Sequence, residues 1–185
     1  LLHWDGTRWS QDRSSVQLWD VWGNAADDIW AVGNAGTAIH WNGVAWSPRN
    51  LPPLAGPAID LRGVWSAGGN EAWATGGDSL FHWDGTKWAR HQSPTADLLR
   101  GVWGSGPNDI WAVGTDIPIG GVILHWDGMS LSTAPTALGA LYSSVWGSGP
   151  SDVWAVGTGT ISHWNGVTWT TNFDQNLYNL GVWGT

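Results

Sequence analysis

The sequence predicts an all-β protein with the architecture of a β-propeller, in which four-stranded sheets are arranged as blades around an axis. The first observation behind this prediction is a repeat, because 19 of the 185 residues are Trp and many of them fall in a regular frame. At intervals of 43, 38, 43 and 37 residues, the frame is marked by Trp22, Trp65, Trp103, Trp146 and Trp183. A period of about 40 residues is typical of repeat architectures, propellers among them.

The second observation is that the predicted strands are apolar on both faces. Neighbouring side chains of a strand point to opposite faces of the sheet, and both Ile110 and Trp111 are large and apolar. Such a strand is expected to be buried on both faces. A sandwich or an ordinary barrel would leave one face exposed and show alternation, whereas a propeller blade is covered on both sides by copies of itself.

The clearest repeat begins with two apolar strands joined by a turn. Residues 99–104 form the first apolar run, and residues 110–114 form the second. Between them lies Gly106-Pro107-Asn108-Asp109. Pro fixes φ and Asn and Asp tolerate turn geometry, so this segment is expected to reverse the chain.

The second half of the same repeat predicts a hairpin. Residues 122–126 are a third apolar run, ending in His125-Trp126. The following Asp127-Gly128 is a strong signal for a tight hairpin turn. A fourth, weaker strand is expected before Pro135, and no helical periodicity is present in the chain.

The other repeats follow the same plan and define the expected blades. Four complete blades are expected at residues 18–60, 61–98, 99–140 and 141–176. Residues 1–17 supply the third and fourth strands of a closing blade, and residues 177–185 supply its first strand. Two explanations stay open for the second strand of that blade: the propeller is five-bladed with a three-stranded closing blade, or the chain is a fragment of a larger propeller. Unless the two terminal segments clasp each other, open blade edges favour a homo-oligomer.

The repeated segments resemble those of a known class of propellers. Residues 102–114 read Val-Trp-Gly-Ser-Gly-Pro-Asn-Asp-Ile-Trp-Ala-Val-Gly, and residues 145–157 are nearly the same. This unit resembles the WD-repeat plan and is closer still to that of Trp-rich bacterial β-propellers. The resemblance covers essentially the whole chain. It implies the fold and says little about function, because propellers host many functions.

Charge and composition exclude several kinds of partner. The formal net charge is −8, with only seven Lys and Arg. Binding to nucleic acid or to an anionic membrane surface requires clustered basic residues, so neither partner is expected. Membrane insertion is not expected, because no apolar run approaches the roughly 20 residues that a spanning helix needs. The chain has no Cys, and no cofactor is expected.

Five His-Trp pairs recur in the frame, but they do not predict a metal site. Their imidazoles belong to His3, His40, His82, His125 and His163. Strands lie about 4.8 Å apart, so equivalent residues on the third strands of neighbouring blades should be on the order of 15 Å apart. Metal ligands must lie about 2 Å from one centre. Each His is therefore expected to be partly buried, with a ring nitrogen bonded to the backbone or to a neighbouring blade.

Catalytic residues are not predicted either. Acidic residues recur before each second strand, at Asp28, Glu71, Asp109 and Asp152, and they are interpreted as turn residues that bond nearby backbone amides. No pair of carboxylates departs from the repeat as a glycosidase pair would, and neither a nucleophile elbow nor a phosphate loop is present. The sequence therefore predicts a protein that is not an enzyme.

Some Trp hairpins suggest a carbohydrate ligand. The segment Trp-Asp-Gly-x-x-Trp is similar to the hairpin of fucose-specific propeller lectins, and this resemblance implies a sugar stacked on indole rings. The candidate ligand-binding residues are Trp4, Trp9, Trp83, Trp88, Trp164 and Trp169. The alternative is that these rings are filler between blades, since a Trp buries about 150–250 Å².

The connections between strands indicate where a ligand would bind. Turns between the first and second strands have constant length, whereas connections vary between the second and third strands and between consecutive blades. In a propeller both variable kinds lie on one face, where recognition is expected. The sequence thus favours a non-catalytic module that binds a glycan or a protein on that face, in a secreted or cell-surface protein of bacteria. The alternatives are a protein-interaction scaffold and a propeller fragment with a role in repeat assembly.

Overall fold

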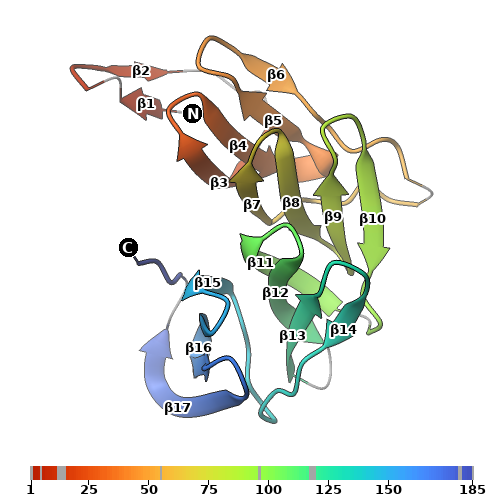
Figure 1. The fold of residues 1–185 in the computed structure, drawn as a ribbon, viewed down its shortest axis with the longest axis vertical. Coiled ribbons are helices and arrows are strands. Elements are labelled where there is room, and N and C mark those ends of the chain that lie inside the picture. The colour runs from red at the N-terminus through yellow and green to blue at the C-terminus, as the bar shows by residue number, and fades with distance from the viewer. Residues whose placement is uncertain are drawn as a thin grey trace.

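The computed structural model describes residues 2–4, 6–11, 16–54, 56–95, 97–116, 120–178 and 181–184. Its strands form four antiparallel sheets of three or four strands and one two-stranded hairpin (Figure 1). The first sheet contains β3 (Leu18–Ala25), β4 (Asp28–Gly33), β5 (Ala38–Trp41) and β6 (Trp46–Pro48). The second contains β7 (Gly63–Gly68), β8 (Glu71–Gly76), β9 (Ser79–Trp83) and β10 (Trp88–Gln92). The third contains β11 (Asp97–Gly106), β12 (Asp109–Asp116), β13 (Gly120–Trp126) and β14 (Leu131–Thr133).

Each of these sheets is a blade of a β-propeller, which confirms the predicted fold class. The blades stand side by side along an arc, with the N-terminal hairpin at one end and the C-terminal segment at the other (Figure 1). Their first strands line the inside of the arc, because β3 contacts β7, β7 contacts β11, and β11 contacts β15 (Ser144–Gly149). The one helical element in the described residues is the short 3-10 turn η1 (Asn34–Gly36).

The fourth blade differs from the expected four strands. It contains β15, β16 (Asp152–Trp164) and β17 (Trp169–Tyr178). The 13-residue β16 covers both the second and the third predicted strands, and Gly159 bends it with φ of 64°. The rings of Trp154 and His163 still face each other across this bend, 4.1 Å apart, as their counterparts do in the other blades.

The predicted closing blade is only partly within the described residues. β1 (Leu2–Trp4) and β2 (Trp9–Gln11) pair with each other as an isolated hairpin. Residues 181–184 are not in a strand, and residues 1, 5, 12–15, 179, 180 and 185 lie outside the described part of the chain. A clasp between the two terminal segments therefore stays a prediction.

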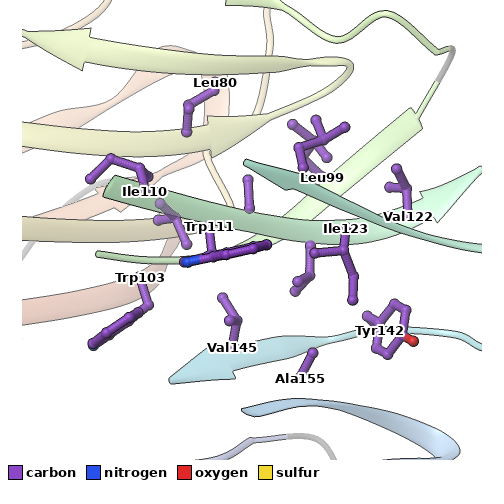
Figure 2. Close-up of a cluster of buried hydrophobic side chains, with 14 of the residues drawn as sticks. Leu80, Leu99, Trp103, Ile110, Trp111, Val122, Ile123, Tyr142, Val145 and Ala155 are labelled. Carbon is purple, nitrogen blue, oxygen red and sulfur yellow. The ribbon is translucent and has the colours of Figure 1, made fainter. Parts of the chain in front are cut away.

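The core lies between the blades, where both faces of the middle strands are buried. Figure 2 shows Ile110 pointing toward Leu80 of the second blade, while Trp111 lies on the side of Val145 in the fourth. Both Ile110 and Trp111 are buried. The two-faced burial predicted from these neighbours is confirmed, and it explains why the strands do not alternate between polar and apolar residues.

A glycine recurs six residues into the second strand of each blade for a steric reason. The four glycines are Gly33, Gly76, Gly114 and Gly157. A Cβ at any of them would collide with a main-chain carbonyl oxygen at the start of the first strand of the same blade or just before it. For Gly114 this oxygen belongs to Leu98, and for Gly157 it belongs to Leu141. The glycine of the repeated Ala-Val-Gly and Ala-Thr-Gly segments therefore permits the backbones of the first and second strands to approach each other closely in every blade.

Candidate functional site

The His-Trp histidines are held by carboxylates of their own blade. His125 Nε2 lies 2.6 Å from Asp109 Oδ1, and the His125 ring is stacked on Trp111 with centroids 4.1 Å apart. The same contact recurs at 2.6–2.8 Å in the pairs His40–Asp28, His82–Glu71 and His163–Asp152. The interpretation of these acids as backbone-bonding turn residues was wrong, as was the expectation that the His would bond to backbone or to another blade. The side chain of His3 lies outside the described residues.

Strand register explains why sequence reasoning missed this pairing. Trp111 and His125 are directly opposite each other on β12 and β13. Asp109 is two residues before Trp111, so its side chain emerges on the same face of the sheet as Trp111. Only the pairing of the two strands brings the acid and the imidazole together, although they are 16 residues apart. The regular spacing of acid and second-strand Trp was the signal that could have revealed it.

The hydrogen bonds lower the pKa of the Asp109 carboxyl group. Burial by itself would raise the pKa of Asp109, but the hydrogen bonds from His125 and Ser105 outweigh burial, and the pKa lies below its usual value. Each of the four described His-Trp imidazoles thus has a carboxylate at one edge and an indole on one face. Within the described ranges, no group of three or more His, Asp or Glu side chains could hold a metal ion.

The candidate Trp pairs lie between blades. In the second blade, Trp83 and Trp88 are 5.6 Å apart, and each lies 6.2 Å from Trp30 of the first blade. In the fourth blade, Trp164 and Trp169 are 5.9 Å apart and lie 5.4 and 5.2 Å from Trp111 of the third. The hairpin of one blade thus covers the second-strand Trp of the preceding blade, and these four rings contribute to the packing between blades.

The N-terminal pair has a different environment. Trp4 and Trp9 are 5.6 Å apart and are 48% and 65% exposed. Trp83, in contrast, is only 8% exposed. The exposed area available to a flat ligand is therefore largest on the N-terminal hairpin.

A surface groove lies beside the second Trp hairpin. It has a volume of about 540 Å³, and Arg49, Trp83, Lys87 and Trp88 are among its lining residues. The guanidinium carbon of Arg49 lies 5.8 Å from the centre of the Trp83 ring, and Trp88 Nε1 donates a hydrogen bond to the Arg49 carbonyl. An aromatic surface, a cation and polar groups therefore converge at this groove.

Two further cavities share a pair of arginines that sequence reasoning missed. The first, of about 390 Å³, lies between residues 57–60 and residues 98–100, beside Gly77. The second, of about 360 Å³, lies on the inside of the arc among the first strands of the blades. Arg62 and Arg100 line both. Residues 57–60 belong to a connection between blades, so the first cavity lies on the face that the variable connections form.

Comparison with solved structures identifies similar folds. YCF48 bound to D1 peptide is 20% identical with a TM-score of 0.65, and the match covers 91% of this chain and 57% of that chain. YCF48 from Cyanidioschyzon merolae is 19% identical with a TM-score of 0.62, covering 89% and 58%. A chain of the mitotic checkpoint complex is 15% identical with a TM-score of 0.65, covering 95% and 57%. This chain therefore spans less than two thirds of the length of these structures.

These likenesses establish the class of protein, which is a β-propeller of WD-like plan. At this level of identity they show the fold alone. No protein-family model matches the sequence, and no curated protein matches it significantly. Among the described residues, none of the helical structure is long and apolar enough to cross a membrane.

Proposed function

We propose that the chain is a non-catalytic binding module whose ligand is a peptide or protein segment. The observation that carries this proposal is the cavity between residues 57–60 and residues 98–100, which is lined by apolar residues together with Arg62 and Arg100. Apolar surface with a few polar groups is typical of a ligand site. Two of the similar folds come from structures that contain a bound peptide or a protein complex, YCF48 with D1 peptide and the mitotic checkpoint complex.

The repeat contacts support a non-catalytic function. The four described His of the His-Trp pairs make the same contact with an acid of their own blade, so none has a special environment. A catalytic group would be expected to depart from the others in its partners or its pKa. The repeated histidines and acids are better explained as structural elements of the blades.

Selection of peptides from a random display library tests the proposed binding site. Wild-type protein should enrich a set of related peptides, and Ala58→Trp, which fills the cavity at an exposed lining position, should abolish their binding. The matched control is Ala45→Trp, an equally exposed substitution in a hairpin that does not line this cavity. Failure to enrich any peptide, or equal binding by both variants, would contradict the proposal.

A carbohydrate ligand is the second candidate, and the groove beside Trp83 and Trp88 favours it. Sugars stack on indole faces and accept hydrogen bonds from cations such as Arg49 and Lys87. Titration with fucose, galactose and N-acetylated sugars should change the Trp fluorescence at millimolar concentration. Trp88→Ala should remove that response, whereas Trp183→Ala, outside the groove, should keep it. A flat titration with every sugar would exclude this candidate and leave the peptide ligand or a scaffold role.

A further inference from the structure

Arg62 and Arg100 occupy the same position in neighbouring repeats. Residues 61–65 and residues 99–103 have the identical sequence Leu-Arg-Gly-Val-Trp. The chain carries a formal net charge of −8 and only seven Lys and Arg, yet two of the seven line one cavity inside the arc. The corresponding residue is Trp19 in the first blade and Ser143 in the fourth, so the packing of the first strands does not require Arg at this position.

The two guanidinium groups are held differently. Arg62 lies over the Trp19 ring, with its guanidinium carbon 4.0 Å from the ring centre, and its Nη2 lies 3.1 Å from Asp60 Oδ2. Trp19 and Asp60 thus orient the Arg62 guanidinium, and its other N–H groups do not take part in the contact with Asp60. Arg100 is exposed, and no side chain in the described ranges forms an ion pair with it. Among the described side chains, Arg100 therefore has no counter-ion, whereas Arg62 is oriented by Trp19 and Asp60.

The first blade shows how a carboxylate sits at the inner edge of a blade. Asp20 Oδ2 accepts a hydrogen bond of 2.9 Å from the backbone N–H of Val64, on the first strand of the next blade. The strand pairing is in the same register in the following blades, where Val102 is opposite Ala112 as Val64 is opposite Ala74. The N–H of Val102 should therefore point toward the inside of the arc like that of Val64.

The second blade has no acid at the position from which Asp20 bonds Val64, so the backbone N–H of Val102 has no equivalent partner. The residue equivalent to Asp20 is Gly63 in the second blade, so no side chain is present at that position to cap the Val102 amide. In the fourth blade the equivalent residue is Ser144, whose Oγ accepts a hydrogen bond from Val182 N–H at 3.3 Å. Among the described residues no side chain takes the place of Asp20 for the Val102 amide, which lies near the two arginines because Val102 lines the same cavity.

We propose that the cavity inside the arc binds a carboxylate group, held between the Arg62 and Arg100 guanidinium groups and the Val102 amide. Guanidinium and carboxylate match in planar geometry and form paired, charge-assisted hydrogen bonds. The inference rests on the proposed function, because it places one carboxylate of the peptide ligand in this second cavity, which shares Arg62 and Arg100 with the cavity beside residues 57–60. The carboxylate could belong to the C-terminus of a peptide or to an Asp or Glu side chain, and both present the same group.

The test uses three short peptides that differ only in their carboxylate. These are acetyl-Gly-Gly-Gln with a free C-terminus, acetyl-Gly-Gly-Glu amide, and acetyl-Gly-Gly-Gln amide, which has no carboxylate. Each is titrated into the full chain labelled with nitrogen-15, and the Val102 amide and the Arg side-chain Nε–H signals are followed. One or both carboxylate peptides should shift the Val102, Arg62 and Arg100 signals saturably, and the neutral peptide should not. Which acidic peptide binds more tightly identifies the source of the carboxylate.

Variants connect the response to the proposed residues. Arg100→Gln should weaken carboxylate binding about tenfold or more, since it removes a hydrogen bond to a charged group. Arg100→Lys, which keeps the charge, should lose less affinity. Arg90→Gln, an Arg substitution at an exposed position outside the lining of this cavity, should leave binding unchanged. Circular dichroism of each variant reports whether its fold is retained.

The possible failures are distinguishable. Equal binding of the neutral and the acidic peptides, no response of the Arg62 and Arg100 signals, or an unchanged affinity in Arg100→Gln would each overturn the carboxylate site. If library peptides still bind and Ala58→Trp abolishes their binding, the proposed function survives that result. If no library peptide binds the wild-type chain at all, the proposed function fails independently of the carboxylate.

Discussion

The imidazole of His82 lies flat on the indole of Trp73, with ring centroids 4.1 Å apart and planes within 9° of each other. Its Nε2 is 2.6 Å from Glu71 Oε1. The acid therefore orients the imidazole so that it extends the aromatic surface of the second strand onto the third. The replacement of Asp by Glu in this blade preserves the contact, which shows that a carboxylate at this place, rather than a particular side-chain length, meets the structural requirement.

Removal of one such carboxylate should destabilise its blade and change the response to acid. We expect Asp109→Asn to cost about 1.5–3 kcal/mol at neutral pH, the usual range for a hydrogen bond to a charged group. The folded pKa of Asp109 lies below its usual value. Its contribution is therefore present above the unfolded pKa of about 3.9 and is lost as the pH falls through the folded pKa.

Urea denaturation of the wild type and Asp109→Asn at pH 7 and at pH 3 measures both effects. The difference between the two proteins should be smaller at pH 3. A difference that is equal at the two pH values would show that the stabilisation does not come from the ionised carboxylate. Asp174→Asn, at an exposed position outside the His contacts, serves as the control for a lost surface charge.

The second-strand Trp should dominate the stability of its blade. Trp111 is buried and contacts Trp164 and Trp169 of the next blade. Trp111→Ala should cost about 3–5 kcal/mol in the free energy of unfolding, the usual range for a buried aromatic residue. Trp183→Ala, at a position that is 76% exposed, should change it by less than about 0.5 kcal/mol. Equal denaturation midpoints for the two variants would contradict the assignment of Trp111 to the core.

The close approach of the first-strand backbone to Gly114 predicts that a larger residue at this position destabilises the protein. A Cβ at Gly114 would collide with the Leu98 carbonyl, so Gly114→Ala should destabilise the protein by about 1–3 kcal/mol, the usual cost of overpacking. Gly106→Ala is the matched control, because no heavy atom lies within 4 Å of a Cβ placed there. Thermal unfolding of both variants checks this prediction. A destabilisation of the same size in Gly106→Ala would show that the loss of stability does not come from the overlap with the Leu98 carbonyl.

The histidines are expected not to take up metal. Each described His of a His-Trp pair has Nε2 beside an acid of its own blade, and only one imidazole is present in each contact. Isothermal titration with zinc, nickel and copper should show no stoichiometric uptake tighter than micromolar. A tight site with one metal per chain would mean that side chains of different blades approach each other far more closely than the strand spacing allows.

The sequence by itself determined the fold class and the approximate positions of the strands in the clearest repeat. Repetition made this possible, because the same apolar runs and Asp-Gly or Asn-Gly turns occur again and again, and each repeat supports the reading of the others. The expected burial of Ile110 and Trp111 on opposite faces also follows from local rules, since successive side chains of any strand point in opposite directions.

Only the tertiary structure decided which side chains meet across strands and blades. The pairing of His125 with Asp109 depends on strand register, and the packing of Trp83 on Trp30 depends on how one blade lies against the next. The same is true of Arg62 and Arg100, whose residues are 38 positions apart in sequence and come together only because the first strands line one cavity. Local propensity specifies each strand, but the positions of neighbouring strands are set by packing over the whole arc, and the candidate binding site is formed by that packing.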